Sequence, residues 1–260
     1  MGDVTVASEG ALKVVRLTRP DKKNALTSAM YATLADAMEA AEGDPAVRAV
    51  VILGAPGAFC AGNDIKDFLA QGGHQAGGDP RERPVIRFLL SLARSSVPVI
   101  AGVDGVAIGI GLTMLLHCDG VLVTPQSRLQ APFLDLAIVP EAASTLLLPQ
   151  RVGYLRAAEI LMLGRPLDGE TAVSLSIAGR VVEPDALERE TFALAERFAA
   201  KAPGAMRDTK RLMRGDTRVM EEVIMAEADI FTGRLSSPEA REVFAAFLEK
   251  RQPDFSKLAG

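Results

Sequence analysis

The stretch of residues 129–145 is almost wholly apolar, yet it places a glutamate directly after a proline, at Pro140-Glu141. Apolar surroundings strip hydration from a carboxylate, disfavour its charged form and raise its pKa. A base tuned in this way can take a proton from a weak carbon acid. A structural alternative is a glutamate in the first turn of a helix, where it interacts with the helix dipole. The stretch alone leaves both interpretations open.

Two turns rich in small residues, 57–64 and 104–113, each follow an apolar run and lead into a helix-like segment. N–H groups at a helix start lack intrahelical acceptors, so those of Asn63 and Ile110 are free to point at a ligand. Two converging N–H groups form an oxyanion hole, suited to a carbonyl that gains negative charge. Alternatively, both turns are only tight connections between a strand and a helix. The presence of Glu141 in an apolar stretch makes this alternative weaker.

Other catalytic patterns are weak. The chain has no Gly-x-Ser-x-Gly motif, and its histidines are His74, in a glycine-rich stretch, and His117, which we expect to be a core residue. The Gly-x-Gly at 109–111 lacks the third glycine of a dinucleotide-binding turn, and no P-loop or zinc pattern is present. Cys60 and Cys118 have no partner at metal-ligand spacing. We therefore expect no metal.

The composition is that of an ordinary globular protein of 260 residues with a net charge of -4. This charge argues against a general nucleic-acid or membrane-surface binder. The length allows one large domain, or one domain with an appendage. Two cysteines favour a reduced compartment, no secretory signal is visible at the start, and the apolar runs are too short to span a bilayer. We expect a cytoplasmic protein without nucleic-acid or membrane partners.

Strand–turn–helix order recurs along the first half of the chain. Two short β-branched runs within residues 4–17 predict a hairpin, and the apolar run at 49–53 predicts a strand buried on both faces. Thr27 or Ser28 is expected to cap a helix over 29–41. Further strands are expected at 97–103 and 120–124, and helices at 81–94 and after the turn at 104–113. This order predicts ββα or βαβ units, and so an α/β fold.

Beyond Glu141 the pattern is mainly helical. We expect a core of residues 1–200 and a C-terminal helical region of residues 201–260. The apolar faces of the late helices favour packing on neighbouring subunits, with packing on the same chain as the alternative. The helices are expected near 142–151, 155–163, 168–176, 185–201, 203–214 and 218–232, and after Ser237-Pro238-Glu239.

Four segments together resemble the crotonase, or enoyl-CoA hydratase/isomerase, superfamily, in order and over essentially the whole chain. They are Asn24-Ala25-Leu26, Ala58-Phe59-Cys60-Ala61-Gly62-Asn63-Asp64-Ile65-Lys66, Val103-Asp104-Gly105-Val106-Ala107-Ile108-Gly109-Ile110-Gly111 and Cys118-Asp119. The resemblance implies a spiral of ββα units and a C-terminal helical region that forms a homotrimer or a dimer of trimers. It implies acyl-CoA thioester substrates, so that coenzyme A is part of the substrate and no separate cofactor is expected. Asn63 and Ile110 become the oxyanion hole.

The chain departs from the hydratases of this superfamily, which use two glutamates to activate water. Thr113 and Phe133 stand at the corresponding positions, and neither is a base. The segments around Pro132 and Glu141 are similar to the 3,2-enoyl-CoA isomerase branch, in which this glutamate is the catalytic base. Phe133 would then exclude water, while Thr113 leaves room or offers a weak hydrogen bond. Asp135 is a second candidate carboxylate, and we expect it to be a solvated or helix-facing structural residue.

The resemblance places further residues along the substrate: Lys23, Ala25, Ala61, Asp64 and Ile65 beside coenzyme A, and Gly109, Thr113 and Phe133 beside the acyl group. The expected reaction moves the double bond of a 3-enoyl-CoA to give a 2-enoyl-CoA, with Glu141 as the single base. One alternative is an enoyl-CoA hydratase or another lyase or hydrolase of the superfamily. An alternative of another class is a non-catalytic member that binds acyl-CoA or RNA, although the acidic balance counts against RNA.

Overall fold

The structure is a computed structural model that describes residues 2–64, 67 and 78–258. Its centre is a sheet in which the N-terminal strand runs antiparallel to its neighbour and the other strands run parallel. The N-terminal pair forms the predicted hairpin, with Val4 opposite Leu17. In sheet order the strands are β1 (Val4–Glu9), β2 (Leu12–Leu17), β3 (Ala49–Leu53), β5 (Val99–Val103), β7 (Gly120–Val123) and β10 (Arg180–Val181).

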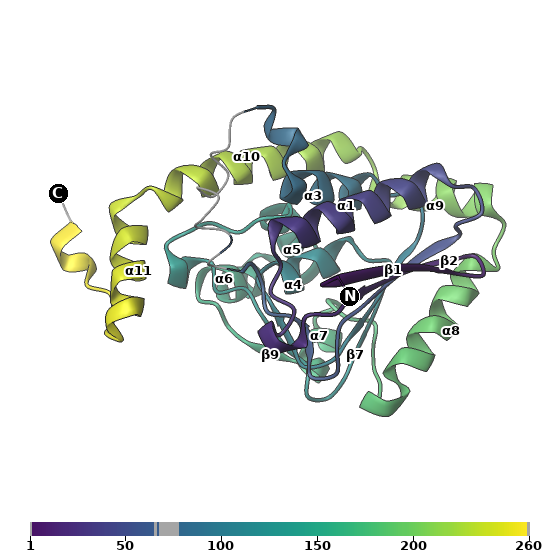
Figure 1. The fold of residues 1–260 in the computed structure, drawn as a ribbon, viewed down its shortest axis with the longest axis horizontal. Helices are drawn as coiled ribbons and strands as arrows, with labels where there is room; N and C mark the ends of the chain where they lie inside the picture. Colours follow the sequence, from purple (N-terminus) through teal and green to yellow (C-terminus); the bar gives the residue numbers. More distant parts are fainter. Residues whose placement is uncertain (1, 65–66, 68–77, 259–260) are drawn as a thin grey trace.

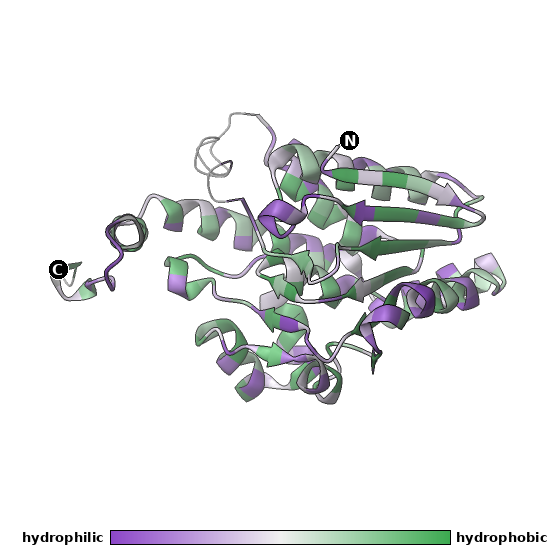
Figure 2. Cartoon of the chain, turned by 60° about the horizontal axis from the view of Figure 1, so that its bottom comes forward, coloured by the Kyte–Doolittle hydropathy of each residue, from purple (hydrophilic) through white to green (hydrophobic). Residues whose placement is uncertain are grey.

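Helices cover both faces of this sheet (Figure 1), so β3 is buried on both sides as predicted, and β5 is buried in the same way. Successive side chains of a strand point to opposite faces. Val50 and Ile52 therefore join the core beneath α1 (Ser28–Gly43) and α3 (Pro84–Arg94), whereas Val51 joins the core beneath α8 (Leu187–Ala199). Figure 2 shows these strands largely in the hydrophobic colour.

A second, smaller sheet lies beside the first, and its strands were not predicted. They are, in sheet order, β4 (Ala58–Cys60), β6 (Val106–Ile108), β8 (Arg128–Gln130) and β9 (Leu167–Asp168). The pairs β3–β4, β5–β6 and β7–β8 each place one strand in each sheet, which confirms the expected repetition of ββα units. The sequence pattern indicated only turns at β4 and β6, because two or three residues are too few to show an alternating pattern.

The predicted helices are present in the described part, with shifted ends. Thr27 caps α1 by accepting from the N–H of Met30. The helix expected to begin at Arg81 begins at Pro84, after the 3-10 turn η2 (Pro80–Glu82). The other helical segments are η1 (Pro20–Lys22), α4 (Ile110–Thr113), η3 (Met114–His117), η4 (Leu134–Leu136), α5 (Ser144–Val152), α6 (Tyr154–Met162), α7 (Gly169–Ser174), η5 (Pro184–Ala186), α9 (Pro203–Arg214), α10 (Thr217–Leu235), α11 (Pro238–Glu249) and η6 (Phe255–Leu258).

The long helix α10 lies against α3 and α5. Ile224 and Phe231 belong to one of the apolar faces for which packing on neighbouring subunits was favoured; they are each 1 % exposed and belong to the core of their own chain. For these residues of α10, the alternative expectation, packing within the same chain, is therefore the correct one. By contrast, α11 and η6 extend away from the body (Figure 1). The boundary near residue 200 stays a prediction.

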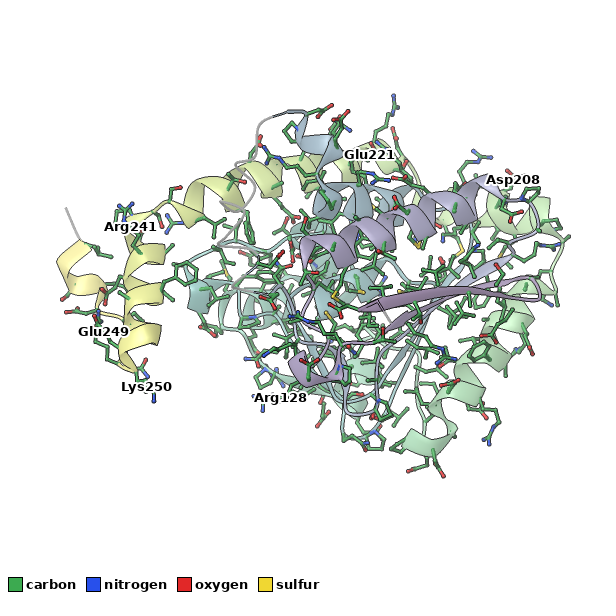
Figure 3. The ribbon with its side chains drawn as sticks, viewed as in Figure 1. Arg128, Asp208, Glu221, Arg241, Glu249 and Lys250 are labelled. Carbon is green, nitrogen blue, oxygen red and sulfur yellow. The ribbon has the colours of Figure 1, made fainter. Side chains whose placement is uncertain are left out.

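Charged side chains mark the outer sides of the helices. Figure 3 shows Asp208 on the outer side of α9 and Lys250 at the end of the projecting α11. Glu221 of α10, also labelled there, pairs with Arg94 of α3 at 2.6 Å. In the described part of the chain, every helix is too short or too polar to cross a lipid bilayer.

Candidate active site

The two glycine-rich turns meet at one end of the smaller sheet. Strands β4 and β6 are parallel neighbours, so the residues that follow them emerge side by side. Gly111 allows the close approach, since a Cβ atom at this position would lie 2.5 Å from the carbonyl oxygen of Cys60. The fold thus brings the turn after Cys60 next to the start of α4.

Both turns present an unpaired backbone N–H group. Gly62, with φ +95°, and Gly109, with φ +56°, adopt conformations that favour glycine and turn the chain before Asn63 and Ile110. Ile110 is the first residue of α4, where no intrahelical acceptor exists. Within residues 2–64, 67 and 78–258, no group accepts a hydrogen bond from the N–H of Asn63 or of Ile110. The geometry suits the predicted oxyanion hole.

Tyr31 orients the side chain of Asn63. Its hydroxyl donates to Asn63 Oδ1 at 2.5 Å, and its ring packs beside Phe88 in the core under α1 and α3. Burial, and secondarily the charge of Glu141, raise the pKa of the Tyr31 hydroxyl well above its usual value, so the group remains a donor. The sequence carries no signal for this contact, because a tyrosine on an amphipathic helix is indistinguishable from a core residue.

Glu141 lies in a cavity of about 230 Å³ between the two turns and the C-terminal helices. Its side chain is 4 % exposed, and its Oε1 atom has no hydrogen-bond partner among the described residues. Burial, and then the nearby charge of Glu227, raise the pKa of the Glu141 carboxyl to about 8. The cavity is lined by Ala61, Gly62, Asn63, Ile108, Gly109, Ile110, Pro132, Phe133, Leu136, Ile138, Glu141, Phe231, Leu235 and Phe244.

This cavity unites two of the three predicted acyl-site residues. Gly109 and Phe133 line it, whereas Thr113 is fully buried in α4 away from the lining, and its hydroxyl has no partner in the described part of the chain. The expected contact between Thr113 and the acyl group is therefore not seen. Asp135 is exposed on η4 and lies outside the lining, as expected of a solvated residue.

The residues predicted to follow coenzyme A gather at the rim of this cavity. The N–H of Ala61 donates to the carbonyl of Lys23 at 2.9 Å, and the N–H of Asp64 donates to the carbonyl of Leu26 at 2.8 Å, so residues 23–26, including Ala25, lie along residues 61–64. Lys23 is exposed. The carboxylate of Asp64 accepts from Arg19 at 2.8 Å, which ties the rim to the segment between β2 and η1. Ile65 lies outside the described residues.

Three residues of the C-terminal helices complete the cavity without having been predicted as site residues: Phe231 and Leu235 of α10, and Phe244 of α11. Phe231 belongs to the apolar face that the sequence pattern assigned to subunit packing. On the same face, Glu227 lies three residues after Ile224 and four before Phe231, and it is 5 % exposed. The sequence could have indicated Glu227 as a buried functional residue, because it is a charged residue within the apolar face of a helix.

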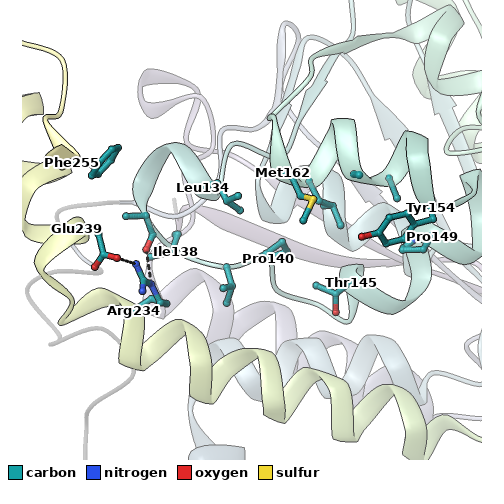
Figure 4. A pocket seen from close by; sticks show the side chains of 15 residues that line it. Leu134, Ile138, Pro140, Thr145, Pro149, Tyr154, Met162, Arg234, Glu239 and Phe255 are labelled. Carbon is teal, nitrogen blue, oxygen red and sulfur yellow. Dashed lines mark hydrogen bonds and ion pairs between the residues drawn. The ribbon is translucent and has the colours of Figure 1, made fainter. Parts of the chain in front are cut away.

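A larger apolar cavity of about 780 Å³ lies next to the first, between the 134–140 loop, α5, α6 and the C-terminal segments (Figure 4). Ile138 lines both cavities, but neither Glu141 nor the turns carrying Asn63 and Ile110 line the larger one. An ion pair between Arg234 and Glu239, 3.0 Å apart, stands at one end. The candidate chemistry therefore belongs to the smaller cavity.

His117 is a core residue, as expected from the sequence, and is 2 % exposed. Across the described ranges, no group of three or more histidine, cysteine, aspartate or glutamate side chains could hold a metal ion.

Known proteins resemble this chain over nearly its whole length. The family model described as enoyl-CoA hydratase/isomerase matches residues 7–258. A crystal structure of an enoyl-CoA hydratase/isomerase from Pseudoalteromonas atlantica has a TM-score of 0.92 at 39 % identity, covering 98 % of this chain and 100 % of that one. A probable enoyl-CoA hydratase of Bacillus subtilis is 31 % identical (98 % of this chain, 99 % of the relative), and a 1,2-epoxyphenylacetyl-CoA isomerase of Escherichia coli is 30 % identical (95 % and 96 %). With its paired sheets and its two turns around a buried glutamate, the chain belongs to the enoyl-CoA hydratase/isomerase family.

Proposed function

We propose that this enzyme converts a 3-enoyl-CoA to a 2-enoyl-CoA with Glu141 as its single base. The observation that carries the proposal is the composition of the smaller cavity: among the described residues that line it, Glu141 is the only titratable side chain. Phe133, at the position that the resemblance assigns to a hydratase glutamate, is an apolar part of the wall and is 4 % exposed. A cavity with one carboxylate and apolar walls favours proton transfer over the addition of water.

The reaction follows from the geometry of base and donors. The Glu141 carboxylate removes a proton from C2 of the 3-enoyl thioester, and the electron pair moves onto the thioester oxygen to form a dienolate. The N–H groups of Asn63 and Ile110 bind that oxygen as its charge develops. The protonated Glu141 then returns the proton to C4, and the double bond closes between C2 and C3. With a pKa of about 8, the carboxyl can both accept and return a proton near neutral pH.

We also propose an acyl-CoA-binding homotrimer, or a dimer of trimers, in the cytoplasm. Exposed apolar side chains support assembly: Leu155 lies on α6, Leu163 directly follows it, and Leu212 and Met213 lie on α9, each at least 72 % exposed. Light scattering of the purified protein should give three or six times the mass of one chain. A monomeric mass would contradict this part of the proposal.

A hydratase is the second candidate, because the Bacillus subtilis relative is named a probable enoyl-CoA hydratase. The two candidates differ in the product that they form, since a hydratase adds water across the double bond of a 2-enoyl-CoA.

A panel of 2-enoyl-, 3-enoyl- and 3-hydroxyacyl-CoA esters, each followed by chromatography, separates these functions. We expect the 3-enoyl ester to be converted to the 2-enoyl ester, and the 3-hydroxyacyl ester to remain unchanged. Formation of 3-hydroxyacyl-CoA at a rate above that of isomerisation would instead establish a hydratase. Tight binding of all three esters without turnover would point to the non-catalytic alternative.

A further inference from the structure

The backbone after Glu141 is held by a second buried glutamate, Glu227 of α10. Its Oε2 atom accepts from the N–H of Ala143 at 2.7 Å. Its Oε1 atom accepts from the N–H of Thr145 at 3.0 Å and from the hydroxyl of Thr145 at 2.6 Å. One side chain thus satisfies three donors within four residues of Glu141.

This segment adopts a backbone conformation that alanine disfavours. Ala142 and Ala143 have φ angles of +66° and +52°, in the left-handed region, and for this reason α5 begins at Ser144 rather than at Ala142 as predicted. Consecutive non-glycine residues persist there only when surrounding contacts hold them. The hydrogen bonds that Glu227 accepts from Ala143 and Thr145 are contacts that hold this left-handed backbone in place.

His117 holds the same segment from the opposite side. Its Nε2 lies 2.7 Å from the carbonyl oxygen of Ala142, and since a carbonyl only accepts, Nε2 carries the proton and donates. Burial lowers the pKa of the imidazole to about 4, so the ring is neutral near pH 7. Ala142 is thus fixed from η3 and Ala143 from α10, and the peptide between them cannot rotate without breaking a buried hydrogen bond.

We propose that Glu227 is a positioning residue, which holds the left-handed turn at residues 142–143 so that the Glu141 carboxylate faces the unpaired N–H groups of Asn63 and Ile110. The inference rests on the proposed role of Glu141 as the base. Glu227 does not line the cavity, so it acts through the backbone of the turn and through its charge.

Glu227 is also the charged neighbour that tunes Glu141. Among the described residues, the other titratable groups that interact with Glu141 are Tyr31 of α1 and Cys60 of β4. Burial raises the pKa of Cys60 to about 12 and that of Tyr31 well above its usual value, so both are neutral near pH 8. Burial raises the pKa of Glu227 to about 7, partly offset by its hydrogen bonds, so this carboxyl ionises in the working range. Its negative charge disfavours ionisation of Glu141.

The test is Glu227→Gln, assayed on a 3-enoyl-CoA beside wild type, Glu141→Gln and the matched control Glu222→Gln, which alters an exposed glutamate of the same helix. The amide keeps the shape of the side chain but replaces one acceptor with a donor. We expect kcat to fall about 10- to 100-fold with KM changed less than about threefold, because a displaced base slows the chemical step. The rising limb of kcat/KM, near pH 8 in wild type, should move to lower pH, because Glu141 loses a like-charged neighbour.

Provided that Glu141→Gln is inactive, two results for Glu227→Gln would overturn the inference. One is a kcat within twofold of wild type; the other is a lower kcat with the rising limb of kcat/KM at the same pH as in wild type. Full activity of Glu141→Gln overturns the proposed function instead. If Glu227→Gln does not fold, Thr145→Val decides, since it removes one of the three hydrogen bonds and keeps the charge. The kcat of Thr145→Val should fall roughly 3- to 10-fold, while the rising limb of kcat/KM stays at the pH of wild type. An unchanged kcat of Thr145→Val overturns the inference.

Discussion

Replacing Glu141 by glutamine is expected to lower kcat for the conversion of 3-enoyl-CoA to 2-enoyl-CoA by roughly 10²- to 10⁴-fold, the usual contribution of a general base. The amide has the size and shape of the carboxyl but cannot take the proton from C2. The affinity for the acyl-CoA should change little, because Glu141 is one of fourteen residues that line the cavity. Steady-state kinetics with calorimetric titration of a non-reactive CoA ester would measure both quantities.

Asp135→Asn is the matched control, since it neutralises an exposed carboxylate in the same segment that lies outside the cavity. Its turnover should equal that of wild type. Near-normal turnover of Glu141→Gln would remove Glu141 as the base. Loss of turnover in Asp135→Asn would instead indicate that Asp135 is the catalytic base.

The same substitution should change how stability depends on pH. The pKa of Glu141 is about 8 in the folded protein, above its ordinary value of 4.5, so between these values the folded state binds more protons than the unfolded state. Its contribution to stability is therefore complete below pH 4.5 and is lost as the pH rises through 8. Glu141→Gln should flatten this decline in urea titrations, and an unchanged decline would show that Glu141 titrates normally.

Replacing Ile110 by proline is expected to lower kcat by about 10²- to 10³-fold relative to Ile110→Ala, because proline removes one donor of the oxyanion hole. The helix tolerates the change, since Ile110 is the first residue of α4 and proline is favoured at that position. The residue before the new proline would be Gly109, whose backbone has φ 56° and ψ −119°. These angles are the mirror image of the extended conformation that residues before proline prefer, and glycine, which has no Cβ atom, can adopt either form.

Ile110→Ala supplies the comparison, because both variants lose the buried isoleucine side chain and only one loses the N–H. Circular dichroism should show equal folding of the two proteins before their rates are compared. Equal kcat values for the folded variants would mean that the N–H of Ile110 does not bind the reacting oxygen.

Local patterns along the chain were enough to predict the hairpin, the buried strands, the cap of α1 and the two turns that end in free N–H groups. Each depends on residues within a few positions of one another: alternation in a strand, a threonine before a helix, a glycine at a sharp turn. The same kind of pattern made Glu141 a candidate base, because its neighbours in sequence are apolar, but the family resemblance was needed to choose that interpretation over a helix-dipole glutamate.

Contacts between distant segments were decided by tertiary packing alone. Tyr31 meets Asn63 across 32 positions, and Glu227 meets Ala143 across 84, so no local pattern could connect them. The same packing turned the apolar face of α10 inward to close the cavity with Phe231, and it buried Thr113 away from the site. The left-handed turn at Ala142 and Ala143 was equally hidden, because alanine favours a helix, whereas the hydrogen bonds with the distant residues Glu227 and His117 hold the turn in another conformation.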